Sequence, residues 1–176
     1  MEYKLDFYQD VSNYQTILTS FCSGEKSVDK FFNSKVDDLN EICNVFIFHE
    51  DDKCIGCCSL QNDTCQIANS YRKQHNVKVK NLHEYPAITL TYFGINQQYQ
   101  HHGYGTEMMF ALFQKLYDAR NSLGAYLILD VESLNDVVPF YESFGFQQIN
   151  KPNFEPTTFL GITVADMETF INEYKR

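Results

Sequence analysis

Two glycines at alternate positions, Gly103 and Gly105, separate a strand pattern from a helix pattern. Before the glycines, apolar and polar residues alternate over 87–95, as they do in a half-buried strand. The segment 103–121, which begins with the glycines, carries an apolar stripe at helical spacing. Glycine lets backbone N–H groups turn toward one point, and the start of a helix adds unpaired donors and partial positive charge. A strand followed by a glycine loop and then a helix therefore predicts an anion site suited to a pyrophosphate.

This loop is neither of two common nucleotide-binding loops. No Gly-Lys-Ser/Thr follows it, so it is not a Walker loop, and the dinucleotide-binding pattern G-x-G-x-x-G is absent. The Gly loop must therefore be interpreted together with the rest of the chain.

Apolar periodicity predicts alternating strands and helices in the rest of the chain. Strands are expected over 44–49, 54–60, 87–95, 125–131 and from Phe146. Helices are expected over 28–39 with Ser27 as N-cap, over 103–121 with Gly124 ending it, over 137–144 with Gly145 stopping it, and over 167–174 after a capping box Thr163-x-x-Asp166. The predicted fold class is α/β (α+β), with a mixed, mostly antiparallel sheet, one parallel crossover and flanking helices. No linker or repeat divides the chain, so one domain over 1–176 is expected.

The net charge of −9 argues against a nucleic-acid or anionic-lipid partner, because both need a basic surface. The first residues lack a signal peptide pattern, and the longest uncharged run, which includes 87–105, is too polar to span a membrane. We therefore expect a cytoplasmic protein with six reduced cysteines and no membrane partner. Four basic residues lie close together between 61 and 86, in a functional loop or a solvated helix face: Arg72, Lys73, Lys78 and Lys80.

The cysteines include one C-x-x-C pair, Cys54 and Cys57. A structural zinc site needs a second pair of ligands at regular spacing, and the sequence offers none. Residues 53–60 are better interpreted as a buried strand in which cysteine acts as a small hydrophobic residue. No metal is expected.

Two motifs resemble the GNAT acetyltransferase superfamily. Gln100-His101-His102-Gly103-Tyr104-Gly105 matches its pyrophosphate signature Gln/Arg-x-x-Gly-x-Gly/Ala. About 35 residues later, Asn135-x-x-Val138-x-x-Tyr141-x-x-Phe144-Gly145-Phe146 is similar to the family's segment after the next strand. Further likeness at 21–24, 29–32 and 55–60 points to a subgroup that includes toxin–antitoxin acetyltransferases, and the resemblance covers about 20–165.

The resemblance implies a GNAT fold and direct transfer of acetyl from acetyl-CoA to a primary amine of a small molecule, peptide or protein. It also implies these cofactor-binding residues: Phe93 and Ile95 for the pantetheine arm, Gln100, His101, His102, Gly103, Tyr104, Gly105 and Thr106 for the pyrophosphate, and Asn135 beside the arm. It implies that Tyr141 donates a proton to the CoA thiolate, which suits a phenol with a pKa of about 10. The general base stays open among Glu84, Asp130, Glu132 and a water chain.

Other interpretations stay open at this point. His101 and His102 fill positions that are usually Arg, Gly, Asn or Lys, so the loop is expected to respond to pH near their reference pKa of about 6.5 unless both simply face solvent. Val138 replaces the usual Ala. One alternative function is a toxin-like enzyme acting on aminoacyl-tRNA through the basic residues between 72 and 80, and another is a silent CoA-binding module. A homodimer is compatible with the family, and an antitoxin partner is undetermined.

Overall fold

A computed structural model describes residues 3–51, 53–80, 82–120, 125–150 and 156–174. The chain divides into two compact units, each made of two separate stretches of sequence. Unit 1 contains Met1–Gln61 and Thr91–Leu112, and unit 2 contains Asn62–Leu90 and Phe113–Arg176. Three elements contribute residues to both units: β3 (Lys53–Cys65), β4 (Tyr85–Ile95) and α5 (Tyr104–Ala119).

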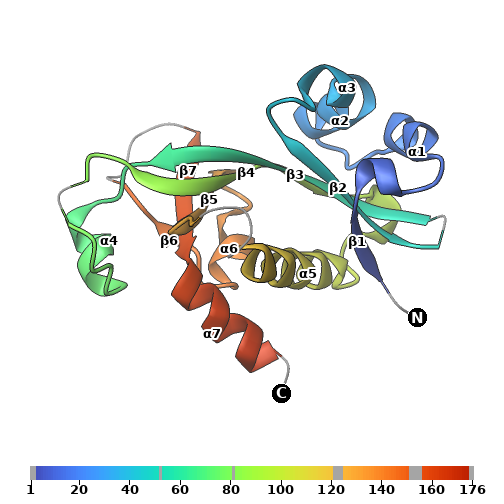
Figure 1. The fold of residues 1–176 in the computed structure, drawn as a ribbon. Helices are drawn as coiled ribbons and strands as arrows, with labels where there is room; N and C mark the ends of the chain where they lie inside the picture. Colours follow the sequence, from blue (N-terminus) through green and yellow to red (C-terminus); the bar gives the residue numbers. More distant parts are fainter. Residues whose placement is uncertain (1–2, 52, 81, 121–124, 151–155, 175–176) are drawn as a thin grey trace. The chain divides into compact units, whose positions relative to one another are not determined.

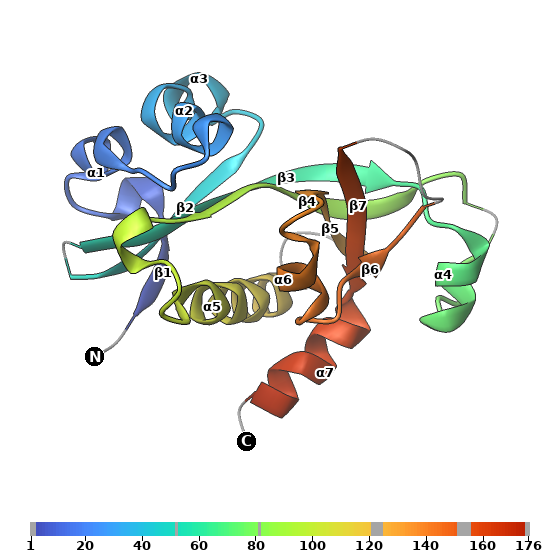
Figure 2. The same ribbon diagram turned by 180° about the vertical axis from the view of Figure 1, so that it is seen from behind.

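Unit 1 combines antiparallel strands with several short helices (Figure 1). Besides its parts of β3, β4 and α5, it contains β1 (Lys4–Phe7), η1 (Tyr8–Asp10), α1 (Tyr14–Ser20), α2 (Lys26–Ser34), α3 (Val36–Leu39), β2 (Asn44–Glu50) and η2 (Gln97–Tyr99). Helices α1, α2 and α3 lie on one side of these strands and the first half of α5 lies on the other, as the opposite views in Figures 1 and 2 show.

The β2–β3 hairpin contains an irregularity that changes which side chains share a face. Phe48 faces Gly56 across the hairpin, but the next residue of β2, His49, faces Cys54. Ile55 is therefore an extra residue on β3, which is the arrangement of a β-bulge. In a regular strand, side chains three positions apart point to opposite faces, whereas across this bulge they can share one.

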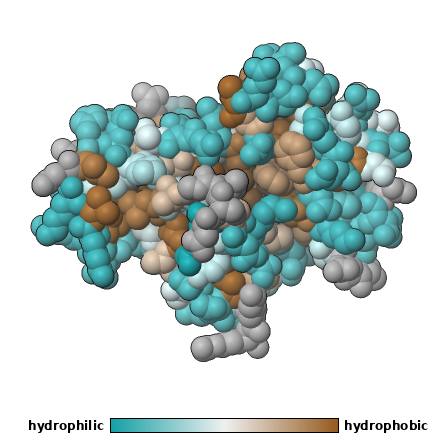
Figure 3. All heavy atoms as spheres, viewed as in Figure 1, coloured by the Kyte–Doolittle hydropathy of each residue, from teal (hydrophilic) through white to brown (hydrophobic). Residues whose placement is uncertain are grey.

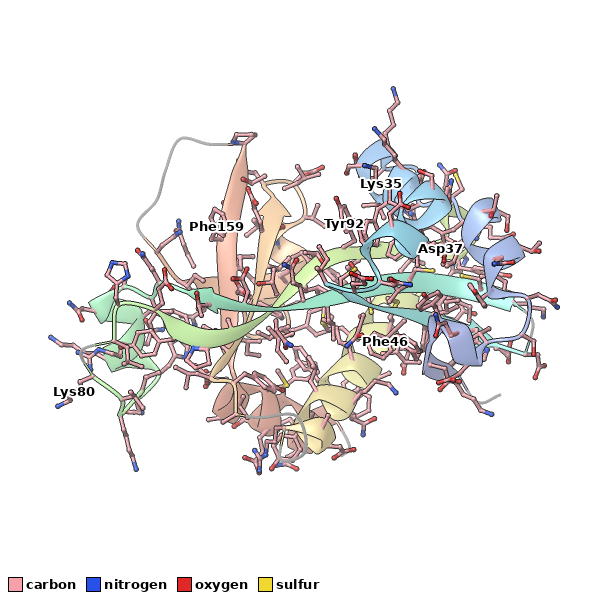
Figure 4. All side chains as sticks on the ribbon, turned by 45° about the horizontal axis from the view of Figure 1, so that its top comes forward. Lys35, Asp37, Phe46, Lys80, Tyr92 and Phe159 are labelled. Carbon is pink, nitrogen blue, oxygen red and sulfur yellow. The ribbon has the colours of Figure 1, made fainter. Side chains whose placement is uncertain are left out.

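The core of unit 1 lies between the short helices and the strands. Its buried members are Tyr8, Val11, Leu18, Phe21, Phe31, Phe32, Val36, Cys43, Val45, Ile47 and Cys57. The ring of Phe31 on α2 stacks on Tyr92 of β4 with centroids 4.2 Å apart, and Figure 4 shows Tyr92 beside this helix. Phe32 packs edge-on against Phe21 at 5.3 Å, a geometry that aromatic pairs prefer. Phenylalanine and tyrosine thus provide the aromatic packing of a chain without tryptophan.

Unit 2 contains the remaining strands and helices. They are α4 (Asn69–Gln74), β5 (Ile128–Leu134), α6 (Val138–Glu142), β6 (Gln147–Gln148), β7 (Thr157–Thr163) and α7 (Val164–Tyr174). The hydrogen-bonded order of the seven described strands is β1-β2-β3-β4-β5-β7-β6. Strands β4 and β5 are parallel, with Thr89 facing Asp130, whereas the β1–β2, β2–β3, β5–β7 and β6–β7 pairs are antiparallel. The predicted fold class is confirmed.

Close packing in unit 2 depends on a glycine in β7. A Cβ atom at Gly161 would lie 2.6 Å from Ile149 and 2.8 Å from Ile128, both too close for real atoms. The carbonyl of the same residue accepts a 3.0 Å hydrogen bond from the hydroxyl of Tyr71 on α4. Elsewhere in unit 2, the ring of Phe113 contacts three other aromatic rings: Phe144, Phe146 and Phe170.

Several predicted elements differ from the structure. The helix expected over 28–39 is two helices, because Lys35 between α2 and α3 leaves the helical conformation. Ser27 is not the N-cap: the carboxylate of Glu25 accepts the Ser27 N–H at 3.2 Å. The strand expected over 125–131 begins only at Ile128, since the Leu127 N–H bonds the Pro86 carbonyl before the paired ladder starts.

Other predictions of the termini of elements have mixed outcomes. The N-cap half of the expected capping box is confirmed, since the Thr163 hydroxyl accepts the Asp166 N–H at 3.2 Å, and the same hydroxyl donates to the Asp166 carboxylate at 2.5 Å. Gly145, with φ of +93°, follows α6 as expected. Gly124 lies outside the described residues. Strands β1 and β7 and helix α1 were not predicted from the sequence.

Candidate active site

The predicted pyrophosphate loop joins η2 to α5 in unit 1. His101 and Gly103 both have left-handed backbone conformations, with φ of +62° and +86°. A Cβ atom at Gly103 would meet no atom within 4 Å, so this side of the loop opens into free space. The first N–H groups of a helix have no partner within the helix. At the start of α5, the N–H groups of Thr106 and Glu107 both donate to the Gly103 carbonyl. The residues 101–106 therefore fit an anionic diphosphate group.

Gln100 holds this loop in place through its side chain. Its Nε2 donates to the carbonyl of Ser23 at 2.7 Å and to the carbonyl of Ile95 at 3.0 Å. The amide nitrogen is thus engaged within the protein, and Gln100 acts on the loop as a positioning residue. The contact with Ser23 spans 77 positions of sequence, so the hexapeptide motif alone could not reveal it.

A second set of contacts fixes the segment to which Gln100 is bound. The carboxylate of Asp29 accepts hydrogen bonds from the N–H and the hydroxyl of Ser23 at 2.6 and 2.7 Å. The Cys22 carbonyl accepts the N–H of Gln97 at 2.8 Å. The sequence motif at 21–24 and 29–32 therefore has a physical purpose, which is to support the loop, and the sequence interpretation had assigned it none.

The two loop histidines have different surroundings. The Nδ1 atom of His102 donates to the Gln100 carbonyl at 2.6 Å, whereas His101 occupies the left-handed turn and is exposed. The ring of Tyr104, at the start of α5, packs edge-on against Tyr99 at 5.9 Å. The loop is thus braced on both sides of its glycine.

Phe93 and Ile95, the residues expected along the pantetheine arm, are half-buried at the end of β4. Between them, Gly94 lies under the α2 region, where a Cβ atom would come within 3.0 Å of Val28 and 3.2 Å of Phe21. The Asn96 N–H then donates to the Ile55 carbonyl of β3 at 2.8 Å. The end of β4 is therefore held tightly before the loop begins.

The other two predicted residues, Asn135 and Tyr141, belong to unit 2. Asn135 follows β5, and its Oδ1 accepts the hydroxyl of Thr158 at 2.9 Å. Tyr141 lies on α6 and is buried, with its ring against Phe140 and Phe146 at 5.2 and 5.5 Å. The structure thus gathers Phe93, Ile95 and residues 100–106 in unit 1, and Asn135 and Tyr141 in unit 2.

The three candidate bases of unit 2 differ in burial. Glu84 and Glu132 are exposed and accept hydrogen bonds from Thr64 and Thr157 at 2.9 and 2.6 Å. Asp130 is buried, and its Oδ1 accepts the Thr89 hydroxyl at 2.8 Å. Burial raises the pKa of Asp130 to about 6, although the hydrogen bond from Thr89 opposes the rise. A group with a pKa near neutrality is suited to general base catalysis, so Asp130 is a candidate for that role.

Neither a metal cluster nor a membrane helix emerges from the described part of the chain. Over those residues, no group of three or more His, Cys, Asp or Glu side chains is placed to hold a metal ion. None of the described helices is long and apolar enough to cross a membrane.

The family model for the acetyltransferase (GNAT) domain matches residues 41–148, which is more than half of the chain. The chain therefore belongs to this family and is an acetyltransferase, as the sequence motifs predicted. A search of curated proteins gives no significant match.

Solved structures of toxin acetyltransferases share the fold. A tyrosine-to-phenylalanine mutant of KacT is 18% identical with a TM-score of 0.78, covering 96% of this chain and 99% of that one. AtaT complexed with acetyl-methionyl-tRNAfMet is 20% identical with a TM-score of 0.76, covering 96% and 98%. An AtaT mutant bound to acetyl-CoA and the C-terminus of the antitoxin AtaR is 20% identical with a TM-score of 0.74, covering 98% and 99%. At these identities, the likeness establishes the fold.

Proposed function

We propose that the chain is one acetyl-CoA-dependent N-acetyltransferase domain over 1–176 that transfers acetyl directly to a primary amine of a small molecule, peptide or protein. The observation that carries the proposal is the open loop at the start of α5, where Gly103 is left-handed and unobstructed. When bound, acetyl-CoA supplies an acetyl group activated as a thioester. Membership of the acetyltransferase family and the acetyl-CoA bound to the AtaT mutant both support this donor.

In unit 1, backbone groups hold the donor. The N–H groups of residues 101–105 hold the pyrophosphate, because a helix N-terminus favours an anion. Gln100 keeps these groups in place through its two bonds to backbone carbonyls. The backbone of Phe93 and Ile95 holds the pantetheine arm as an added strand would be held.

In unit 2, side chains accept and donate the protons of the transfer reaction. Asp130 accepts a proton from the acceptor ammonium, because its pKa of about 6 leaves it ionised at pH 7 and still able to take a proton. Tyr141 donates its phenolic proton to the departing sulfur, and Asn135 is the further cofactor-binding residue of this unit. The proposed location of the enzyme is the cytoplasm, where cysteines stay reduced.

A second candidate acceptor is aminoacyl-tRNA, whose amino acid also offers a primary amine. One observation favours it: Lys73, Lys78 and Lys80 are exposed on and after α4, and among the described residues no carboxylate lies within 4.0 Å of them. Figure 4 shows Lys80 extending away from the strands, and Figure 3 shows apolar side chains at the surface near α4. The complex of AtaT with acetyl-methionyl-tRNAfMet supports this candidate.

Binding of two donors tests the role of the loop. S-acetylpantetheine carries the same thioester as acetyl-CoA but lacks the pyrophosphate and nucleotide. We expect calorimetric titration to give at least about tenfold weaker binding of S-acetylpantetheine, equal to ~1.4 kcal/mol. Equal affinity for both donors would contradict the proposed loop function.

Replacing Tyr141 tests its role as the acid. General acid catalysis typically contributes about 10² to 10⁴-fold, so Tyr141→Phe should lower kcat by about 10²-fold while KM for acetyl-CoA changes little. Phe140→Leu, next to it on α6, is the matched control for altered packing. An unchanged kcat in Tyr141→Phe would exclude Tyr141 as the proton donor.

A further inference from the structure

The C-x-x-C pair in β3 is brought together by the bulge of the β2–β3 hairpin. The Sγ atoms of Cys54 and Cys57 lie 3.6 Å apart, although residues three positions apart in a regular strand point to opposite faces. The extra residue Ile55 shifts the register and places both thiols on the same face. Their separation is van der Waals contact and leaves about 1.5 Å to close to the length of a disulfide, ~2.05 Å.

The two thiols have different surroundings that suit different steps of an oxidation. Cys54 is half-buried and reachable from solvent, whereas Cys57 is fully buried in the core of unit 1 beside Val45 and Ile47. Burial raises the pKa of the Cys57 thiol well above its usual value, and the neighbouring Cys54 raises it further. An oxidant therefore meets Cys54 first, and Cys57 is in contact to resolve the product.

We propose that Cys54 and Cys57 form a dithiol that a peroxide oxidises to an intrachain disulfide. In the first step, the Cys54 sulfur attacks hydrogen peroxide, the O–O bond breaks, and the products are a sulfenic acid and water. In the second step, the Cys57 sulfur attacks the Cys54 sulfur, the S–O bond breaks, and the hydroxyl leaves as water with the Cys57 proton. The dithiol loses two electrons and two protons, and the peroxide is reduced to two molecules of water.

The bulge also connects this pair to the pyrophosphate loop. Ile55, the residue between the cysteines that forms the bulge, accepts the N–H of Asn96 at 2.8 Å, and Asn96 immediately precedes η2. Beside it, a Cβ atom at Gly56 would lie 2.8 Å from the Gly94 carbonyl, so β3 and β4 are in tight contact here. Drawing Cys54 toward the buried Cys57 must move the bulge, and the disulfide thereby weakens acetyl-CoA binding. This consequence rests on the proposed function.

The disulfide is tested by treating the purified, reduced protein with hydrogen peroxide and mapping its thiols by mass spectrometry. The expected product lacks two hydrogen atoms in the peptide containing both cysteines, and dithiothreitol restores the original mass. Cys54→Ser should abolish this product, whereas Cys22→Ser, which removes an exposed thiol elsewhere, should leave it unchanged. Oxidation confined to sulfinic acid at Cys54, or a disulfide using other cysteines, would overturn the proposal.

Phenylarsine oxide provides a second test that does not depend on oxidation. A trivalent arsenical bridges two adjacent thiols, so one equivalent should add to the wild-type protein and to Cys22→Ser, and none should add stably to Cys54→Ser. Failure of the wild-type protein to bind the arsenical would show that the two thiols do not share a face.

The coupling to the loop is measured by acetyl-CoA titration of the reduced and oxidised protein. Acetyl-CoA should bind the oxidised protein at least about threefold more weakly, and Cys54→Ser should bind it equally before and after peroxide treatment. If the disulfide forms without any change in the affinity for acetyl-CoA, the proposed coupling between the disulfide and the pyrophosphate loop is wrong. If the reduced protein does not bind acetyl-CoA at all, the proposed function fails, whereas the disulfide result stands.

Discussion

Replacing Asp130 by asparagine should make the protein more stable at neutral pH and less active. Asp130 is buried on β5, and burial raises its pKa from 3.8 to about 6. Asparagine has nearly the same shape, carries no charge, and its Oδ1 can still accept the hydrogen bond from Thr89. The variant therefore removes the cost of a buried charge without leaving the Thr89 hydroxyl unpaired.

The magnitude follows from the linkage between proton binding and unfolding. Between about pH 4 and pH 6, the folded state keeps the Asp130 proton and the unfolded state releases it, so the free energy of unfolding falls as pH rises. Below about pH 4 the stabilising contribution is fully present, and above about pH 6 it is lost. At about 1.4 kcal/mol per pKa unit, the total loss is ~3 kcal/mol, of which ~2 kcal/mol falls between pH 4.5 and pH 7.5.

The assay is urea denaturation of the wild-type protein and Asp130→Asn at pH 4.5 and pH 7.5. The stability of the variant relative to the wild type should increase by ~2 kcal/mol between the two pH values. Glu132→Gln, an exposed neighbour on the same strand, is the control and should stay within about 0.5 kcal/mol of the wild type at both pH values. A difference between Asp130→Asn and the wild type that stays constant with pH, or that shrinks toward pH 7.5, would refute the reasoning.

Three further substitutions test the packing and the loop. Gly56→Ala places a Cβ atom 2.8 Å from the Gly94 carbonyl oxygen and should lower the free energy of unfolding by about 1 to 3 kcal/mol in urea denaturation; an unchanged midpoint would contradict the close contact. Thr163→Ala removes the N-cap that binds the Asp166 N–H and should cost about 1 kcal/mol, measurable as a lower Tm, with Thr163→Ser as the conservative control. Gln100→Ala frees the loop and should weaken acetyl-CoA binding by about tenfold, or ~1.4 kcal/mol; unchanged calorimetric affinity would exclude its positioning role.

The sequence predicted the parts of the fold that depend on local periodicity. Helix α5 was expected over 103–121 and occupies Tyr104–Ala119, because its apolar stripe and preceding glycines act within a few residues. Strand β7 was not predicted, because Gly161 interrupts its apolar pattern. That glycine is required by contacts with Ile149 and Ile128, which lie far from it in the sequence and could not be foreseen.

In the candidate site too, the sequence predicted the local features and did not predict the contacts between residues far apart in the chain. The glycine motif predicted a loop at a helix start, and the structure contains one with Gly103 left-handed. The motif could not indicate that Gln100 binds the Ser23 carbonyl, because the two residues meet only in the folded chain. The ranking of Asp130 above the exposed Glu132 likewise needed burial, which two neighbouring carboxylates in a sequence do not reveal.

The most direct test of N-acetyl transfer is to incubate the purified protein with acetyl-labelled acetyl-CoA and a cytosolic extract, and to count the label in separate fractions. We predict label as an N-acetyl amide in the small-molecule, peptide or protein fraction. Label on aminoacyl-tRNA, with strong salt dependence, would instead support the second acceptor. Label in no fraction from a protein that binds acetyl-CoA would contradict catalysis and leave a silent CoA-binding module.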